Sequence, residues 1–254
     1  MNSKKPLIFI SNDDGFQAKG LRELMKVLRP MAHLVVMAPT VGQSGKACAL
    51  TFQTPVNFYE VSRDEDVEIY ACNGTPADCV KLAFQELLPV APDLVVGGIN
   101  HGDNSAVNVH YSGTMGVVLE GCMKGVPSIG YSLCSHEADA DFTPLFPYIE
   151  SITRKVLEEG LPKGSCLNVN FPDEHPYKGV LACRQASGMW NNEWVSHQHP
   201  RKGTYYWLTG DFTPDCTGIE YDRNALSEGY VAITPIQLDM TDYSMLKQIK
   251  TWNL

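Results

Sequence analysis

The chain has 254 residues, enough for one large domain or for a domain with an appended arm. Hydrophobic residues make up 44% of it and charged residues 19%, which is typical of a globular protein with ample apolar material for a core. Lysine and arginine total 20 against 29 aspartates and glutamates, and the net charge of −9 argues against binding to nucleic-acid polymers or anionic membranes. One small phosphate ligand remains compatible with this charge, because a bound cation can invert the local field.

Targeting signals and cysteine usage indicate the compartment. Residues 1–7 include two lysines but lead into only a short apolar run, so we expect no signal peptide. No stretch approaches the ~20 apolar residues of a membrane helix. The eight cysteines include no C-x-x-C pair, which favours free, mostly buried thiols over a zinc site or a disulfide framework. We therefore expect a cytoplasmic protein without membrane contact.

The first half of the chain alternates strand and helix signals. Residues Leu7–Ser11 form a short apolar run, as expected for a strand that is covered on both faces. Apolar residues then recur at the spacing of one helix face, at Leu21, Leu24, Met25 and Leu28. Pro30 ends this predicted helix, and Leu34–Ala38 is a second buried strand.

The same signals continue to about residue 171. Further helices are predicted after Thr75-Pro76, over Met115–Met123 and over Leu145–Leu157, and further strands at Leu94–Val96, Val126–Ser132 and Cys166–Phe171. Strands that alternate with helices predict an α/β fold with a doubly wound, mainly parallel sheet.

The character of the sequence changes after about residue 180. Short β-like runs occur at Val180–Arg184, Tyr205–Leu208 and Tyr230–Thr234, between loops rich in Trp, His, Asn and Gly. We interpret this region as a C-terminal β-hairpin or arm that ends in a helix over Asp242–Trp252. The prediction is thus a core over residues 1–180 and an arm with a helix over residues 181–254.

Polar residues follow several predicted strands, and in an open parallel sheet ligands bind beyond the carboxyl ends of the strands. Asp13 and Asp14, within Asn12-Asp13-Asp14-Gly15, come directly after the first strand. Two carboxylates in one turn can both approach a cation, and hard oxygen ligands suit Mg²⁺, Mn²⁺ or Ca²⁺ rather than zinc. The alternative is a solvated turn, because Asp and Gly are common turn formers.

Other strand ends could complete such a site. Ser44 could supply a hydroxyl oxygen after the second strand, and Asn100 an amide oxygen after the strand at Leu94. Tyr111-Ser112-Gly113-Thr114 precedes a predicted helix, where exposed N–H groups and hydroxyls can bind an anion. The alternative for this motif is simple capping of the helix by Ser112 or Thr114.

Common nucleotide-binding and hydrolase motifs are missing. The run Gly42–Ala47 lacks the first glycine of a P-loop and carries Ala47 where magnesium would need Ser or Thr. No G-x-G-x-x-G follows the first strand, and there is no G-x-S-x-G nucleophile elbow. A P-loop, a dinucleotide site and an α/β-hydrolase serine are therefore excluded.

Several blocks taken together resemble one known family. They are Ile10-Ser11-Asn12-Asp13-Asp14-Gly15 with Gly20, Ala38-Pro39 with Gln43-Ser44-Gly45 and Thr51, Gly74-Thr75-Pro76-Ala77-Asp78, Pro92-Asp93-Leu94-Val95-Val96, Gly98-Ile99-Asn100 with Gly102 and Asn104, and Tyr111-Ser112-Gly113-Thr114. In this order they resemble the SurE (survival protein E) family of 5′/3′-nucleotidases. The strong match covers roughly residues 6–133, and a weaker one continues through Tyr205-Tyr206-Trp207, Gly229-Tyr230-Val231 and Ile233-Thr234-Pro235.

The resemblance implies a Rossmann-like core with one divalent cation per subunit, Mg²⁺ or Mn²⁺. The positions that match the family's metal ligands are Asp13, Asp14, Ser44 and Asn100. The positions that match its phosphate site are Asn12, Asn104, Ser112, Gly113 and Thr114. The family also forms dimers or tetramers through a C-terminal arm, so a homodimer or homotetramer is expected. Gly97 departs from the serine of many members, without removing a matched ligand.

The predicted reaction is metal-assisted attack of water on nucleoside 5′- or 3′-monophosphates, with Asp13, Asp14 and Asn12 as catalytic residues. Asp13 as a covalent phosphoryl acceptor is the nearest rival mechanism. Two alternative functions stay open at this point: a module that binds metal and nucleotide without turnover, and a phosphatase for non-nucleotide esters or short polyphosphate.

Overall fold

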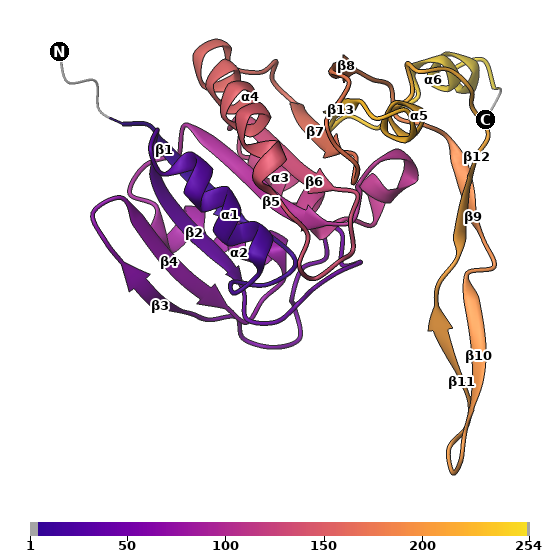
Figure 1. The fold of residues 1–254 in the computed structure, drawn as a ribbon, viewed down its shortest axis with the longest axis horizontal. Helices are drawn as coiled ribbons and strands as arrows, with labels where there is room; N and C mark the ends of the chain where they lie inside the picture. Colours follow the sequence, from indigo (N-terminus) through magenta and orange to yellow (C-terminus); the bar gives the residue numbers. More distant parts are fainter. Residues whose placement is uncertain (1–4, 253–254) are drawn as a thin grey trace.

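A nine-stranded sheet with helices on both faces forms the body of the molecule in the computed structural model, which describes residues 5–252 (Figure 1). The strand order is β3-β4-β2-β1-β5-β6-β7-β13-β8. The strands are β1 (Leu7–Ser11), β2 (His33–Pro39), β3 (Phe58–Arg63), β4 (Val67–Cys72), β5 (Leu94–His101), β6 (Ser128–Leu133), β7 (Ser165–Phe171), β8 (Val180–Ala182) and β13 (Val231–Gln237). Residues 1–4, part of the stretch in which we expect no signal peptide, lie outside the described residues.

The sheet is mainly parallel and changes its winding direction between β1 and β5. β1 pairs in parallel with β2 on one side and with β5 on the other, and only β3 and β13 run antiparallel to a neighbour. From β1 the chain builds outward through β2 to β4, and then returns to start β5 on the opposite side of β1. This is a topological switch point, where open α/β sheets bind their ligands beyond the carboxyl ends of the strands.

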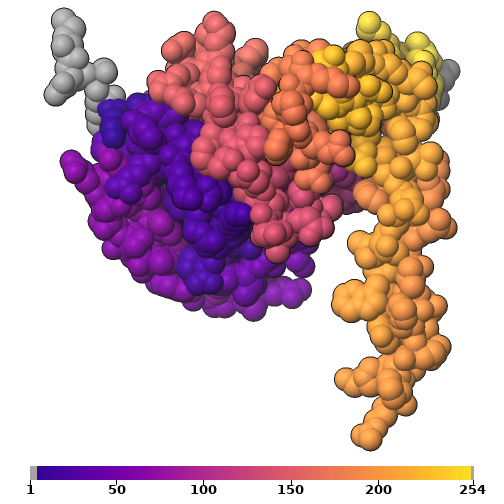
Figure 2. All heavy atoms as spheres, in the orientation of Figure 1, coloured from indigo at the N-terminus to yellow at the C-terminus, as the bar shows by residue number. Residues whose placement is uncertain are grey.

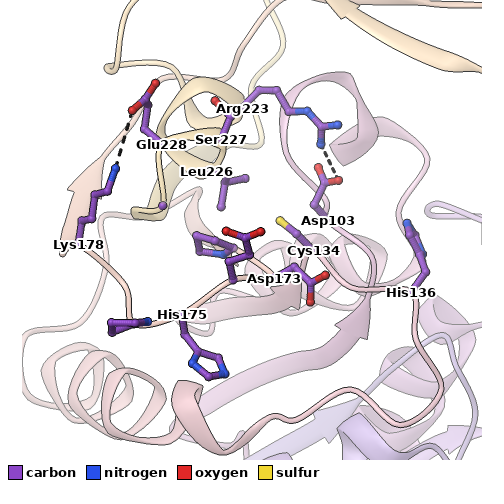
Figure 3. A pocket seen from close by; sticks show the side chains of 14 residues that line it. Asp103, Cys134, His136, Asp173, His175, Lys178, Arg223, Leu226, Ser227 and Glu228 are labelled. Atoms are coloured by element: carbon purple, nitrogen blue, oxygen red, sulfur yellow. Dashed lines mark hydrogen bonds and ion pairs between the residues drawn. The ribbon is translucent and has the colours of Figure 1, made fainter.

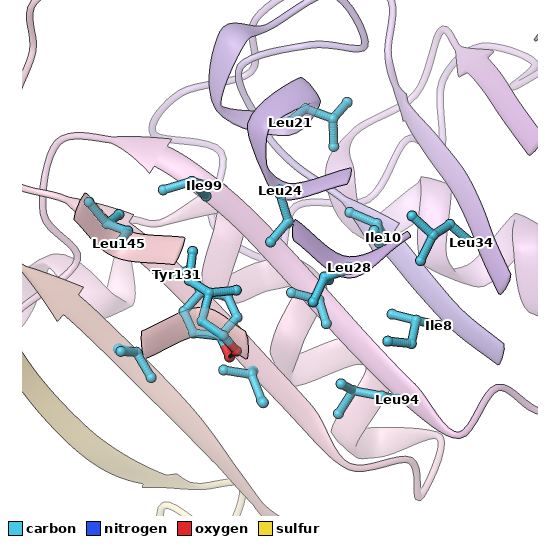
Figure 4. Packing of buried hydrophobic residues seen from close by; sticks show 14 of the residues in the cluster. Ile8, Ile10, Leu21, Leu24, Leu28, Leu34, Leu94, Ile99, Tyr131 and Leu145 are labelled. Carbon is cyan, nitrogen blue, oxygen red and sulfur yellow. Dashed lines mark hydrogen bonds between the residues drawn. The ribbon is translucent and has the colours of Figure 1, made fainter. Parts of the chain in front are cut away.

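Four helices cover the two faces of the sheet: α1 (Lys19–Leu28), α2 (Pro76–Leu82), α3 (Gly113–Met123) and α4 (Phe146–Glu159). α1 and α4 pack on one face over one buried apolar cluster. α2 and α3 pack on the other face over a second cluster. Figure 4 shows the first cluster, in which Leu21, Leu24 and Leu28 of α1 lie over Ile8 and Ile10 of β1. The helical spacing of these leucines in the sequence therefore identified the buried face of α1.

Shorter helical turns connect the main elements. They are η1 (Ala83–Leu87), a π-helix that continues α2, and the 3₁₀ turns η2 (Ala106–His110) and η3 (Thr143–Leu145). No helix within residues 5–252 is long and apolar enough to cross a membrane.

Helix α3 lies unusually close to β5. A Cβ on Gly97 of β5 would stand 2.8 Å from the carbonyl oxygen of Thr114, so a larger residue would push the helix away. Gly97 thus lets the amino end of α3 pack against the strand. This contact brings the start of α3 to the carboxyl ends of β1 and β5.

A long two-stranded ribbon projects from the body (Figures 1 and 2). It consists of β9 (Gly188–Asn191), β10 (Trp194–His199), β11 (Gly203–Leu208) and β12 (Asp211–Pro214), paired antiparallel as β10–β11 and β9–β12. We call residues 188–214 the arm. After it come the helices α5 (Asp222–Ser227) and α6 (Tyr243–Ile249).

The predicted α/β fold with a mainly parallel sheet and a C-terminal hairpin is confirmed. Of the three β-like runs predicted for the arm, only Tyr205–Leu208 lies there. The other two overlap β8 and β13, which belong to the main sheet, so this part of the interpretation was wrong. Strands β3 and β4 were not predicted. β3 is an edge strand with five of its six residues exposed, so its sequence lacks the apolar run of a buried strand.

Candidate active site

The turn after β1 carries the two aspartates and is closed by the side chain of Asn12. The Asn12 amide nitrogen donates to the Gly15 carbonyl at 3.0 Å, and its amide oxygen accepts from the Gly15 N–H at 3.2 Å. Asn12 is fully buried, and Gly15 has φ 103°, a conformation that favours glycine. Asn12 therefore holds the backbone that presents Asp13 and Asp14.

Asp13 lies against the amino end of α3. Its side chain is 4% exposed, and its Oδ1 accepts a hydrogen bond from the Thr114 hydroxyl at 2.5 Å. A Cβ on Gly113 would lie 2.6 Å from the Asp13 Cβ, so the carboxylate needs a glycine there. Burial raises the pKa of Asp13 to about 6; the Thr114 hydrogen bond opposes this rise, and the negative charge of Asp14 adds to it.

Asp14 is only partly buried and faces the end of β5. Its Oδ2 accepts from the backbone N–H of His101 at 3.4 Å, and burial raises its pKa. The two neighbouring carboxylates thus point to the junction between β1 and β5. Among the described residues neither of them takes part in an ion pair.

Asn100, near the end of β5, turns its amide oxygen toward Asp13 and α3. Its amide nitrogen donates to the carbonyls of His101 at 3.2 Å and Gly102 at 2.7 Å. Its oxygen lies 3.4 Å from the Thr114 hydroxyl, which also bonds Asp13. The structure therefore brings the Asn100 and Asp13 oxygens to one hydroxyl group.

Ser44 lies on the loop after β2, and this loop runs beside the aspartate turn. The N–H of Gln43 donates to the Asp13 carbonyl at 2.6 Å, which fixes the backbone next to Ser44. The far end of the loop is held by Asp78, whose Oδ1 accepts from Thr51 N–H at 3.2 Å, and by Thr75, whose hydroxyl donates to the Ala49 carbonyl at 2.7 Å. The Ser44 side chain itself is exposed, and its role as a ligand stays a prediction.

The residues at the start of α3 have two roles: Ser112 caps the helix, and Gly113 and Thr114 lie against Asp13. Ser112 caps the helix, because its hydroxyl accepts from the Met115 N–H at 3.0 Å. Thr114 faces Asp13 instead, and Gly113 lies between them as the contact surface. The first turn of α3 also directs the positive end of its dipole toward this place, which favours a bound anion.

Asn104 belongs to a buried polar network on β6 and β7. Its N–H donates to Asn170 Oδ1 at 2.8 Å, its side-chain nitrogen to Ser132 Oγ at 2.8 Å, and its carbonyl accepts from Asn168 at 2.7 Å. The sequence analysis missed Ser132, Asn168 and Asn170. Asn168 and Asn170 could have been found in the sequence, because two asparagines at alternate positions of a buried strand lie on the same face of the sheet.

The donors at this place fit a hard divalent cation. The buried Asp13 carboxylate has a raised pKa, and Asp14 adds a second negative charge beside it. The Asn100 oxygen faces the same point because its amide hydrogens are bonded to carbonyls. Within residues 5–252 no group of three His, Cys, Asp or Glu forms a metal cluster, so the candidate ligands are two carboxylates with neutral oxygens, which suits Mg²⁺ or Mn²⁺ better than zinc.

A pocket of about 600 Å³ lies beyond the ends of β6 and β7, next to Asn104 (Figure 3). Asp103 and His136 form its wall on the side of the site, and Arg223 of α5 pairs with Asp103 at 2.7 Å. On the opposite side Lys178 lies 3.9 Å from Glu228. The sequence analysis did not find this pocket, because its lining residues come from four separate stretches between Asp103 and Gly229.

Comparisons with known proteins agree on one family. The family described as survival protein SurE matches residues 8–192. Proteins named 5′-nucleotidase SurE are 57% identical in Phocaeicola vulgatus, over 100% of this chain and 99% of theirs, and 52% identical in Bacteroides fragilis, over 100% of both. The crystal structure of the SurE protein from Aquifex aeolicus aligns with a TM-score of 0.83 at 34% identity, covering 96% of this chain and 98% of that one.

The matched region contains the aspartate turn, the Ser44 loop, Asn100 and the start of α3, so the residues that meet at the switch point all lie inside it. The likeness extends through the arm and the last strand in the full-length relatives. The chain therefore belongs to the survival protein SurE family.

Proposed function

We propose that this SurE-family 5′-nucleotidase hydrolyses nucleoside 5′-monophosphates, and also 3′-monophosphates, to nucleoside and phosphate with one divalent cation per subunit, Mg²⁺ or Mn²⁺. The observation that carries the proposal is the junction at the switch point, where the buried Asp13 carboxylate and the Asn100 oxygen share the Thr114 hydroxyl. The name 5′-nucleotidase SurE, carried by relatives that match over the full length of this chain, supports the same reaction class.

The cation would be held by Asp13, Asp14, Ser44 and Asn100. When bound, it would polarise the phosphoryl oxygens and lower the pKa of a water molecule. The protein supplies the geometry around it: Asn12 fixes the aspartate turn, and Thr114 orients Asp13 through their hydrogen bond. Each group thus keeps its position without rearrangement during the reaction.

The phosphate would lie between the start of α3 and the network of Asn104. Backbone N–H groups of the first turn, from Gly113 and Thr114, would face its oxygens together with the Ser112 hydroxyl, while the Thr114 hydroxyl keeps its hydrogen bond to Asp13. Water forms the new P–O bond while the bond to the nucleoside oxygen breaks, and that oxygen leaves with a proton from solvent. Asp14, the more exposed carboxylate, is placed to orient the attacking water.

The arm is proposed to join copies of the chain into a homodimer or homotetramer, with residues 1–180 as the catalytic part and residues 181–254 as the assembling part. Its hairpin exposes Trp194, Tyr206, Trp207 and Leu208, each by more than half. A two-stranded hairpin with apolar side chains on both faces is marginal in water unless another surface covers it. A second copy of the chain, with the same exposed ribbon, satisfies this requirement.

The deciding experiment is phosphate release by metal-depleted protein, with Mg²⁺, Mn²⁺ or EDTA added, from a panel of substrates. The panel holds 5′- and 3′-monophosphates of the four ribonucleosides, glycerol phosphate and short polyphosphate. We expect metal-dependent release from the nucleotides, abolished by EDTA. Nucleotide binding without release would establish the binding module instead, and preference for glycerol phosphate or polyphosphate would establish a different phosphatase. A trapped phosphoryl group on Asp13 would replace water attack by the covalent mechanism.

A further inference from the structure

The segment between Asn100 and Ser112 connects the two halves of the proposed site. Residues 103–111, here called the linking segment, run from the end of β5 to the amino end of α3 and include η2. They join Asn104 to the start of α3, the two parts that line the proposed phosphate site. Ala106 within the segment has φ 52°, a left-handed conformation that a residue with a Cβ seldom adopts unless its surroundings hold it.

The core holds only the first part of this segment by hydrogen bonds. Asn104 bonds to β6 and β7 through Ser132, Asn168 and Asn170. At the other end, the Tyr111 carbonyl accepts from the N–H of Ala47 at 3.1 Å. Between these points Val109 packs in the apolar cluster beneath α3, and the long-range hydrogen bonds come from the C-terminal part of the sequence.

Asp222, the first residue of α5, provides the central contact. Its carboxylate is fully buried, and Oδ2 accepts from the backbone N–H of Ala106 at 3.1 Å. Oδ1 accepts from the N–H of Ala186 at 2.9 Å, where the chain approaches the arm, and from the N–H of Arg223 at 2.7 Å. One carboxylate therefore joins the linking segment to the base of the arm.

Two neighbouring residues reinforce this connection. Arg223 forms an ion pair with Asp103 at 2.7 Å, which Figure 3 shows at the edge of the pocket. Trp190 of β9, in the arm, donates its indole N–H to Asn108 Oδ1 at 3.1 Å. Within residues 5–252, the side-chain hydrogen bonds that residues 105–110 make outside the linking segment go to Gln185, Trp190 and Asp222.

We propose that Asp222 and Arg223 are positioning residues for the nucleotidase reaction: through Ala106 and Asp103 they fix the linking segment, and with it the distance between Asn100 and the phosphate-binding start of α3. This inference rests on the proposed function. It assigns to the C-terminal part of the chain a role inside the active site of the same subunit, in addition to assembly. A site whose halves are separately mobile loses productive geometry, and a shift of about 1 Å can cost a hundredfold in rate.

The first test is Asp222→Asn, which keeps the shape of the side chain but replaces one acceptor oxygen by an NH₂ group facing N–H donors. We expect the KM for a nucleoside 5′-monophosphate to rise about tenfold, because the phosphate-binding start of α3 is displaced. Hydrogen–deuterium exchange of peptides covering residues 103–111 should accelerate about tenfold, while peptides of β1 stay unchanged. Arg223→Gln, at a half-exposed position that leaves the core filled, should shift both readouts in the same direction by about threefold.

Asp211→Asn is the matched control, since it makes the same chemical change at an exposed residue of the arm and should leave both readouts unchanged. A purely structural role would lower the folded fraction and the apparent kcat while KM stays constant, and that result overturns the inference. Unchanged hydrogen–deuterium exchange of residues 103–111 in both Asp222→Asn and Arg223→Gln overturns it as well. If the wild-type protein releases no phosphate, the proposed function fails, and the exchange measurement still decides whether Asp222 holds the segment.

Discussion

Asp13 is the residue on which the chemistry depends most. It is buried beside a second carboxylate, and within the described residues the groups that bond its side chain are the neutral Thr114 hydroxyl and backbone N–H groups. A buried carboxylate without a countercharge is costly, and a divalent cation removes that cost. The same feature that destabilises the metal-free protein would therefore supply affinity for the proposed metal.

Asp13→Asn should reduce metal-dependent phosphate release by about a hundredfold or more, because a charged ligand worth several kcal/mol in the transition state is lost. The fold should persist, since asparagine can still accept the Thr114 hydrogen bond. Initial rates with Mn²⁺ across a concentration series, together with circular dichroism, check this. Asp211→Asn serves as the control, and an Asp13→Asn enzyme with full manganese-dependent turnover would refute the ligand assignment.

The raised pKa of Asp13 also predicts how the metal-free protein responds to pH. Between about pH 4 and 6 the folded protein keeps a proton on Asp13 that the unfolded chain has released, so this group's contribution to the free energy of unfolding falls as pH rises. Above about pH 6 the loss is complete, at roughly 3 kcal/mol, because a tenfold change in proton affinity corresponds to about 1.4 kcal/mol.

Urea unfolding of EDTA-treated wild type and Asp13→Asn at pH 4 to 7 isolates this effect, since the asparagine does not titrate. The difference in unfolding free energy should move in favour of the variant as pH rises to 6 and then level off. Saturating Mn²⁺ at pH 7 should restore the wild type's advantage. A difference that is flat with pH would mean that Asp13 is not buried as a carboxylic acid.

At the scale of elements, the contact between α3 and the aspartate turn depends on a missing side chain. Gly113→Ala would place a Cβ 2.6 Å from the Cβ of Asp13, so either the helix or the carboxylate must move. We expect at least a tenfold loss of Mn²⁺ affinity, measured by calorimetry on metal-depleted protein. A displacement that small suffices because ligand distances must hold to a few tenths of an ångström.

Gly121→Ala is the matched control on the same helix. Its Cβ would meet Ser128 Oγ at 2.6 Å and Val95 at 2.8 Å, so it should destabilise the packing of α3 on the sheet to a similar degree. Its Mn²⁺ affinity per folded molecule should nevertheless stay near that of the wild type. Equal losses of affinity in both variants would show that general loosening of α3, and not displacement of Asp13, causes the effect.

Elements buried on both faces could be predicted from the sequence, and elements at the edges could not. β1 and β2 are continuous apolar runs, and the polar residues after β1 and at the end of β5 predicted Asp13, Asp14 and Asn100 as site residues, because ligands bind at strand ends. β13 was assigned to the wrong place, since its β-branched pattern does not reveal which strand it pairs with, and its partner β7 lies about 60 residues earlier.

The part of the site that escaped prediction is made of long-range contacts. Asp222 bonds to Ala106 across 116 positions, and Asn104 bonds to Asn170 across 66. In the sequence, a single aspartate at the start of a short helix indicates only an ordinary first-turn residue. The tertiary structure is needed to show which N–H groups donate hydrogen bonds to its carboxylate. Local signals thus predicted the groups that the structure brings together at the switch point, whereas the residues that hold those groups needed the tertiary structure.

At the scale of the whole molecule, the exposed hairpin predicts an assembly. Tyr206 and Leu208 lie on one face of β11 and Trp207 on the other, so both faces offer apolar contacts. Trp207→Ser combined with Leu208→Ser should shift the mass measured by light scattering from a multiple of 28.1 kDa toward that of a smaller species. Gln198→Ser on the same hairpin is the control, and a wild type that is already a 28.1 kDa monomer would contradict the proposed assembly.

The ribbon leaves and re-enters the body at adjoining points, since Arg184 and Tyr221 form a bridge just before and after it. The ribbon therefore begins and ends at the same place on the body, and its length does not affect the order of the nine strands. Insertions or deletions at the tip would change the spacing of subunits in the proposed assembly while every residue around Asp13 keeps its neighbours. The tip can accordingly vary in length independently of catalysis, whereas the base of the ribbon is tied to the segment beside the proposed site.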